Sequence, residues 1–292
     1  VSGAAIHYNG TYSADYENNG YSSKYSYYQR PCWLGIRRAW LFIENVDRVP
    51  DMKEAEKQRL KAEAKVIIAM HYCDLFRHYG GVPIVDHAYT ANEDMQKERG
   101  TVQETLDFIV NLLDEAADVL PWAMSAAENR EWEGRLTKAS AMGLKARILL
   151  FAASPLFNSS EPYMPGEAAD KRLMWFGSYK PELWTQALAA HKAFFDELNK
   201  NGQYGLVYKS DPRQAFRSGY LDRGTGEAII ATHYGYTVPD YWTWGWSYYE
   251  TAGDAGTACG TQELVDMFPS QKVNYMIRNT RMNNVIPAYM KQ

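Results

Sequence analysis

The stretch AEAKVIIAMHYCDLFRHYGGVPIV, residues 62–85, decides the fold. Its apolar residues recur at steps of three and four, which is the period of one helix face, and the pattern predicts a helix over about 51–79. The Gly-Gly-Val-Pro run that follows ends this helix, because glycine adopts the backbone angles of a helix end and proline cannot continue one. The predicted apolar stripe consists of Leu60, Ala64, Ile67, His71, Leu75 and Phe76. The residues at the exit, which we expect to be structural, are Arg77, Tyr79, Gly80 and Gly81.

Periodicity and stop signals predict four more helices, at about 33–49, 101–120, 137–153 and 181–201. Thr101 and Glu104 form a capping box at the start of the second of these. Small residues crowd helix 137–153, which favours close packing of two helix backbones. The pairs 33–49/51–79 and 101–120/137–153 are expected to be antiparallel hairpins that resemble tetratricopeptide units, although no strict 34-residue period holds. The apolar face predicted for helix 181–201 consists of Trp184, Leu188, His191, Phe195 and Leu198.

Two stretches lack a helical period, residues 1–30 and 202–268. Within the second, residues 227–233 read as a short strand. We therefore expect one mainly α domain: a helical scaffold over about 33–200, decorated by long irregular loops with a few short strands. Because binding residues concentrate on loops, the two irregular stretches are the predicted ligand-binding part.

Composition excludes several classes of protein. The 292 residues carry a net charge of −4 and no long basic run, which argues against nucleic acid as a partner. The three cysteines, Cys32, Cys73 and Cys259, have no metal-ligand spacing and predict neither a disulfide framework nor a zinc site. Cys73 lies within a predicted helix, and we interpret it as a small buried hydrophobe. No apolar run approaches the ~20 residues of a membrane-spanning helix.

Motifs of catalysis or cofactor binding are not found: there is no Gly-rich phosphate loop, zinc-protease helix, nucleophile elbow or EF-hand loop. The sequence thus predicts no cofactor and no metal. His71 and His78 share a helix face, and we interpret them as packed or hydrogen-bonded. Asp240, Glu250 and Asp254 are candidates for a glycosidase acid pair, but solvated loop carboxylates are the commoner interpretation.

Three blocks of sequence resemble the SusD/RagB family of outer-membrane nutrient-binding lipoproteins of Bacteroidota. They are the AEA start with YCDLFRHYGGVPIV at 72–85, RLTKASAMGLKARILLFAASP at 135–155, and TQELVDMF at 261–268. The resemblance covers about 33–268. Family members are longer, with a lipidated N-terminal cysteine and further C-terminal segments. We therefore expect this chain to be a fragment, with residues omitted near Ser270.

The resemblance implies a function. Family members use tetratricopeptide-like helices as a rigid scaffold, and aromatic rings on irregular loops bind a glycan without catalysis. A member of this family is expected to lie at the cell surface, held to the outer membrane by a lipid anchor that this chain does not contain. It delivers oligo- or polysaccharide to a SusC-like TonB-dependent transporter.

The segment YWTWGWSYYE, residues 241–250, is the predicted glycan platform. Its rings alternate with small residues, so in an extended chain they share one face. A buried strand would show the same alternation, and this alternative stays open. The chain has 22 Tyr and 9 Trp against 10 Phe, and rings with a polar edge suit half-wet surfaces. The predicted ligand-binding residues are Trp242, Trp244, Trp246 and Tyr248, with Tyr12, Tyr16 and Tyr25 from the N-terminal stretch.

Two other functions remain open at this point. A helical-repeat protein that binds a peptide or protein cargo would need the same scaffold. A glycan-active enzyme on an α/α fold would use the acidic residues near the aromatic segment. The sequence does not name the glycan.

Overall fold

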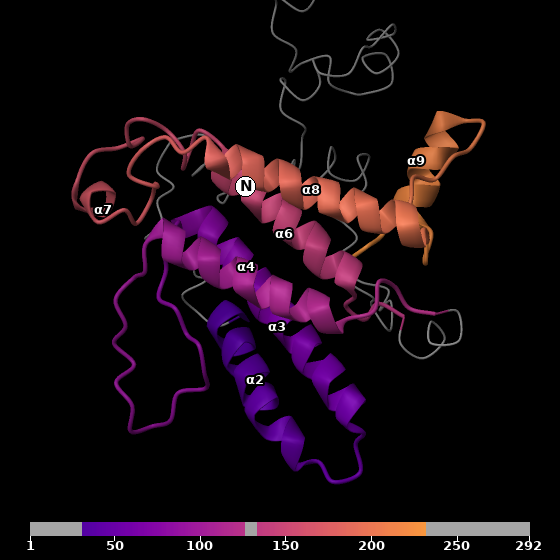
Figure 1. Cartoon of the computed structure of the whole chain (residues 1–292), viewed down its shortest axis with the longest axis horizontal. Coiled ribbons are helices and arrows are strands. Elements are labelled where there is room, and N and C mark those ends of the chain that lie inside the picture. Colours follow the sequence, from indigo (N-terminus) through magenta and orange to yellow (C-terminus); the bar gives the residue numbers. More distant parts are fainter. Residues whose placement is uncertain (1–30, 126–132, 232–292) are drawn as a thin grey trace, which may run out of the picture. The chain divides into compact units, whose positions relative to one another are not determined.

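The structure is a computed structural model, and it describes residues 31–125 and 133–231, which belong to one compact unit. The described part is mainly helical, as predicted (Figure 1). Its helices are α2 (Pro31–Asn45), the 3-10 turn η1 (Val46–Arg48), α3 (Glu54–Tyr79), α4 (Val102–Val119), α6 (Lys138–Ala153), α7 (Glu167–Asp170), α8 (Glu182–Asn201) and α9 (Pro212–Leu221). No described helix is apolar over a length sufficient to span a bilayer.

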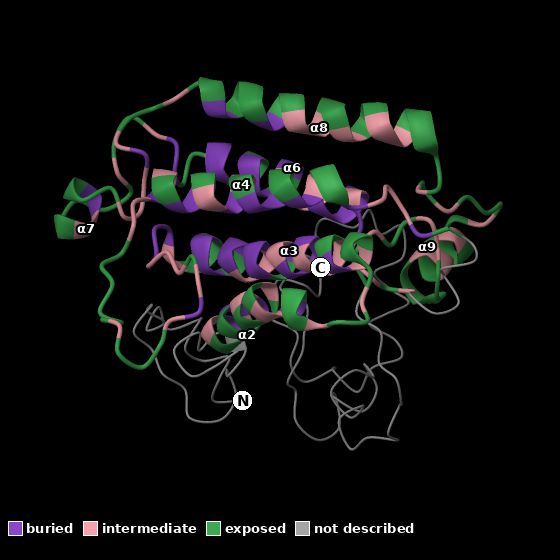
Figure 2. Ribbon diagram, turned by 60° about the horizontal axis from the view of Figure 1, so that its bottom comes forward, coloured by how far each residue is buried: buried purple, intermediate pink, exposed green. Residues whose placement is uncertain are grey.

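Five of these helices pack in chain order, α2 on α3, α3 on α4, α4 on α6 and α6 on α8. Figure 2 shows them as successive layers with the buried residues between them. Both predicted pairs, α2 with α3 and α4 with α6, are therefore present. The contact between α3 and α4 is as extensive as the contacts within the pairs, so the helices form one continuous row.

The buried face of α3 is wider than the predicted stripe. Ile67 is 41% exposed, whereas Val66, Ile68 and Tyr72 are fully buried. The reason is that α3 lies between α2 and α4 and is covered from two sides, so its apolar residues do not follow a single stripe. Full burial of one such aliphatic side chain stabilises the fold by about 1.5–3 kcal/mol.

Two capping boxes fix where α4 and α6 begin. The hydroxyl of Thr101 accepts from the backbone N–H of Glu104, whose carboxylate accepts from the N–H of Thr101 at 2.7 Å, as the sequence predicted. Thr137 and Ser140 make the equivalent pair at the start of α6. Ala139, Ala146, Ala152 and Ala153 of α6 are buried and Gly143 is half-buried, as expected for a helix that packs closely on its neighbours.

The predicted apolar face of α8 is wrong. Leu183 and Ala187 are buried, while Trp184, Leu188 and Phe195 are 42%, 55% and 54% exposed. Phe194 faces inward, and its ring lies 3.8 Å from the position that a Cβ on Gly143 of α6 would occupy. The helix therefore packs on α6 through a face one residue away from the predicted one.

The exit of α3 confirms the structural role of the two glycines. Gly80 has φ +74° and donates to the carbonyl of Phe76 at 2.8 Å, and Gly81 donates to the carbonyl of Leu173 at 2.7 Å. The guanidinium of Arg99 donates to the carbonyls of Tyr79 and Gly81 from 2.7 and 2.8 Å. The chain thus turns sharply where a side chain would have no room.

Two predictions for the region after α8 need correction. Residues 227–231 form turns and bends, so the predicted strand at 227–233 is absent from its described part. Helix α9 was not predicted, although Asp211 and Pro212 are a start signal: the Asp211 carboxylate accepts from the N–H of Arg213 at 2.9 Å, and Pro212 occupies the first turn. Ten residues were too few to show a clear period beside the irregular sequence around them.

Candidate functional site

The residues predicted to bind the ligand lie outside the described ranges. These are Trp242, Trp244, Trp246, Tyr248, Tyr12, Tyr16 and Tyr25. The same holds for the acidic candidates Asp240, Glu250 and Asp254 and for Cys259. The platform therefore stays a prediction from the sequence.

A polar cavity of about 390 Å³ lies among the connection from α4 to α6, the segment after α8 and the turn after α9. Thr137, Gln203, Tyr204 and Thr225 contribute hydroxyl and amide groups to its lining. Backbone of Gly224 and Gly226 completes the wall. The size suits a small ligand, and such groups hydrogen-bond sugar hydroxyls as donors and acceptors.

Long-range contacts position the cavity walls. The indole N–H of Trp122 donates to the carbonyl of Gly202 at 3.0 Å, and the ring of Tyr204 meets that indole edge to face at 5.8 Å between centroids. The hydroxyl of Tyr204 lies 3.3 Å from that of Thr137. At the start of α6, Ser140 donates to the carbonyl of Ile229 at 3.2 Å. The cavity thus joins residues that are far apart in the sequence.

The charged residues at the cavity are already paired. Nε of Arg135 lies 2.6 Å from Oε2 of Glu63, a carboxylate that is buried beside it. Glu133 is bound by Arg223 at 2.8 Å. With these charges compensated, the cavity suits the uncharged hydroxyl groups of a sugar better than an ionic group.

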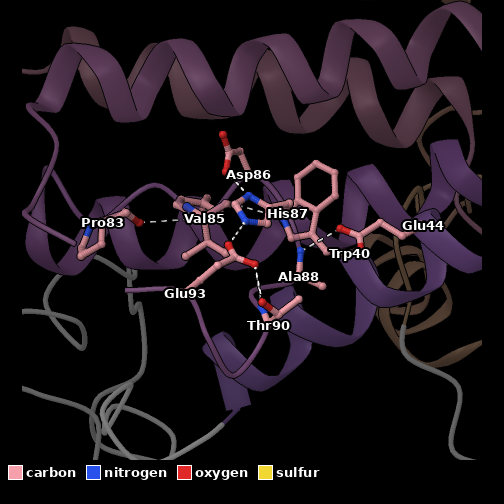
Figure 3. A network of polar contacts seen from close by, with 10 residues as sticks. Trp40, Glu44, Pro83, Val85, Asp86, His87, Ala88, Thr90 and Glu93 are labelled. Atoms are coloured by element: carbon pink, nitrogen blue, oxygen red, sulfur yellow. Dashed lines mark hydrogen bonds and ion pairs between the residues drawn. The ribbon is translucent and has the colours of Figure 1, made fainter. Parts of the chain in front are cut away.

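A second polar feature is the loop after α3, which α2 and α3 hold in place (Figure 3). The indole of Trp40 donates to the carbonyl of Val85 at 2.8 Å, and the carboxylate of Glu44 accepts from the N–H of Ala88 at 2.8 Å. The hydroxyl of the buried Tyr72 donates to the carbonyl of Pro83 at 3.0 Å and accepts from the N–H of Val85 at 2.7 Å. Side chains of α2 and α3 thus hydrogen-bond the backbone groups of this segment, which is not paired with a strand in the described part of the chain.

His87 closes this loop between two carboxylates (Figure 3). Its Nδ1 lies 2.7 Å from Asp86, and its Nε2 lies 2.7 Å from Glu93. Glu93 also accepts from the N–H and hydroxyl of Thr90. Hydrogen bonds to the carboxylates raise the pKa of His87, and those from His87 and Thr90 lower the pKa of Glu93 to about 2. Because both ring nitrogens are engaged, the cluster is not a metal site, and none was found among the described residues.

This geometry predicts a pH-dependent loop. The raised pKa of His87 means that its stabilising effect is complete below about pH 6.5 and is lost as the pH rises through the higher folded value. The ionised carboxylate of Glu93 stabilises the loop fully above its ordinary pKa, and this stabilisation is lost only as the pH falls towards about 2. The charged groups around His87 and its loop are Arg37, Glu44, Asp86, Glu93 and Lys97.

We expect amide hydrogens of residues 86–93, corrected for intrinsic exchange, to lose protection as the pH rises above about 6.5 and through the raised pKa of His87. The same loss should be absent in His87→Gln. The side chains of His87 and Glu93 are 43% and 38% exposed, so added salt should weaken the effect. Equal pH dependence in the wild-type and variant loops would show that His87 does not control it.

His71, His78 and Cys73 are packed or hydrogen-bonded, as interpreted from the sequence, and Cys32 is buried as well. His71 packs against Gly35, and burial lowers its pKa; His78 donates from Nδ1 to the carbonyl of Asp74 at 2.7 Å. Cys32 and Cys73 are buried and not disulfide-bonded, and desolvation raises the pKa of both thiols to about 12. Thiols with such pKa values are inert as nucleophiles at neutral pH.

Taken by fold and site, the described residues define a tetratricopeptide-like helical scaffold that carries polar sites on its connections. The family model described as "Starch-binding associating with outer membrane" matches residues 2–150, just over half of the 292 residues. The chain belongs to the SusD-like family.

Individual relatives agree with this membership. SusD-like protein P38 of Formosa agariphila is 31% identical over 117 residues, which are 40% of this chain and 21% of that protein. The solved structure of BT4246 is 26% identical with a TM-score of 0.58, covering 70% of this chain and 34% of that one. A SusD-like protein of Bacteroides fragilis shares the fold at 24% identity, with a TM-score of 0.51 and 32% of its own chain covered. This chain thus spans about a third or less of each of these three proteins.

Proposed function

We propose that this protein binds oligo- or polysaccharide at the surface of the outer membrane and delivers it to a SusC-like TonB-dependent transporter. The observation that supports this most is membership of a family described as starch-binding and associating with the outer membrane. The lipid anchor and the transporter partner are what that family implies for the whole protein.

Binding is proposed to rest on two kinds of contact. A sugar ring has a face of C–H groups, which a flat aromatic ring desolvates, and a rim of hydroxyls, which polar side chains and backbone hydrogen-bond. The alternating rings of Trp242, Trp244, Trp246 and Tyr248 are proposed to supply the first contact, with Tyr residues of the N-terminal stretch. The cavity around Thr137 and Tyr204 is suited to the second.

We propose that this protein does not cleave the glycan. Hydrolysis of a glycosidic bond requires two carboxyl groups set across the sugar, one of them protonated. The two carboxylates nearest to the cavity, Glu63 and Glu133, are each bound to an arginine. Such paired groups suit a site that holds its ligand unchanged.

Affinity electrophoresis in native gels that contain single polysaccharides tests the proposal. Retarded migration in at least one gel of a broad panel, relative to a gel without polysaccharide, is the expected result. Serum albumin run alongside controls for sieving by the polymer. If no polysaccharide in the panel retards the chain, the proposed glycan binding is wrong, and a peptide or protein cargo becomes the alternative to test.

A further inference from the structure

Helix α9 presents an unusual face to solvent. Arg213, Phe216, Arg217 and Tyr220 follow each other at steps of three and four, so they form one continuous strip along the helix. Phe216 and Tyr220 are 75% and 81% exposed, and both arginines are exposed. Aromatic residues at this spacing normally face a core. We call these four residues the α9 strip.

The inner side of α9 explains why the strip faces outward. Gly219 lies against the turn after the helix, where an added methyl would come within about 2.5 Å of Oε2 of Glu227. Thr225 donates to the carbonyl of Gly219 at 3.3 Å, and the same Glu227 carboxylate accepts from the N–H of Val207 at 2.7 Å. Gly219 is thus held against the turn, and no residue of α9 is buried, so its large side chains lie on the solvent side.

The two rings of the strip are aligned with each other. Phe216 and Tyr220 are parallel within 2°, with centroids 6.4 Å apart. The two rings are thus parallel to each other on the exposed side of the helix, where a ligand can reach them. Such rings desolvate the C–H faces of sugars.

The arginines of the strip have no charged partner within the described ranges. Neither Arg213 nor Arg217 forms an ion pair there, in contrast to Arg135 and Arg223 at the nearby cavity. An exposed guanidinium can bind a sulfate or carboxylate with two parallel hydrogen bonds. Two of them beside two rings therefore match a ligand that combines sugar faces with regularly placed negative charges.

We propose that the α9 strip is an accessory binding surface for an acidic polysaccharide, one whose sugars carry sulfate or carboxylate groups. This proposal rests on the proposed glycan-binding function and names the class of glycan. Arg213 and Arg217 bind the acidic groups, and Phe216 and Tyr220 stack on the sugars between them.

Binding of dextran sulfate, with unsulfated dextran as its neutral match, tests the strip. Arg213→Gln/Arg217→Gln should weaken dextran sulfate binding at least about tenfold and reduce its dependence on salt, because charge-assisted contacts are lost. Phe216→Ala/Tyr220→Ala should weaken it also at high salt, where stacking persists. The charge-matched control is Arg48→Gln/Lys192→Gln, two exposed cations elsewhere on the scaffold, which should change the affinity less than about twofold. Circular dichroism and the melting temperature should be unchanged in all variants, because every substituted side chain is exposed.

Any of the following outcomes would overturn the inference. Wild-type chain that does not bind dextran sulfate, an arginine variant that binds it like wild type, or a control variant that is weakened equally would each do so. A strip that instead drives self-association, lost in Phe216→Ala/Tyr220→Ala while dextran sulfate binding persists, would assign it to contacts between copies. The strip variants should also be run in the affinity gels with neutral polysaccharides. If a neutral polysaccharide still retards them, the protein binds glycans independently of the strip, and the proposed function holds even where the inference about the strip fails.

Discussion

Gly80→Val is expected to destabilise the fold by at least about 3 kcal/mol. Gly80 has φ +74° and ψ −121°, a conformation that a β-branched residue adopts only with strain. A Cβ there would also collide with the carbonyl oxygen of Leu173, which is backbone and has no freedom to turn away. Backbone strain and overpacking each cost about 1–3 kcal/mol, and the Cβ of the introduced valine would cause both, so the two costs should add.

Two other glycines separate these causes. Gly202 has φ +66° but nothing within 4 Å, so Gly202→Val should show the strain alone, about 1–3 kcal/mol. Gly205 has open space and no positive φ, so Gly205→Val should stay within about 1 kcal/mol. Urea unfolding of the three variants measures the series. The folded fraction of Gly80→Val should bind glycan normally, since the residue is structural; full stability with lost binding would contradict this account.

Replacing single tryptophans of the predicted platform gives the second large effect. If Trp242, Trp244 or Trp246 stacks on a sugar, its change to alanine should cost about 1–3 kcal/mol of binding, on the scale known for aromatic stacking on bases. The melting temperature should barely change, because a stacking ring is already half exposed. A ring in a core would instead cost about 3–5 kcal/mol of stability.

Thermal melting and glycan affinity, measured on each single variant, separate the two cases. We expect at least one of the three to act as a platform and at least one to be packed, because three neighbouring ring positions seldom all face a ligand. Trp175→Ala is a useful control: its half-buried indole donates to the carbonyl of Ala169 at 3.0 Å, so it should lose stability and keep its affinity. If all three platform variants melt early and the folded remainder binds normally, residues 241–250 are a buried strand.

Local rules in the sequence predicted much of the fold. The capping box at Thr101 and the Gly-Gly exit at Gly80 are determined by residues close together in the chain, and both were found where expected. The face that each helix buries was harder to predict, because it depends on which other helices pack against it. Ile67 and Trp184 occupy apolar periods and are nevertheless exposed, since α3 has neighbours on two sides and α8 packs on α6 through Leu183 and Ala187.

The candidate sites show the same limit more strongly. Thr137 and Tyr204 are in contact although 67 residues separate them in the sequence, and Arg223 and Glu133 although 90 do. No local sequence pattern predicts either contact. The sequence could have predicted the α9 strip, since Asp211-Pro212 signals a helix start and Phe216 and Tyr220 lie four residues apart. The sequence could not have predicted that the strip faces solvent, because this depends on the packing of Gly219 against Glu227.

The central claim is that this protein binds a glycan and leaves it intact. The most direct test incubates the chain with a polysaccharide that retards it in affinity gels, then measures the heat of binding and the number of reducing ends in the same sample. The account predicts saturable binding and no increase in reducing ends over a control without protein. Newly released reducing ends would contradict it and identify a glycan-cleaving enzyme instead.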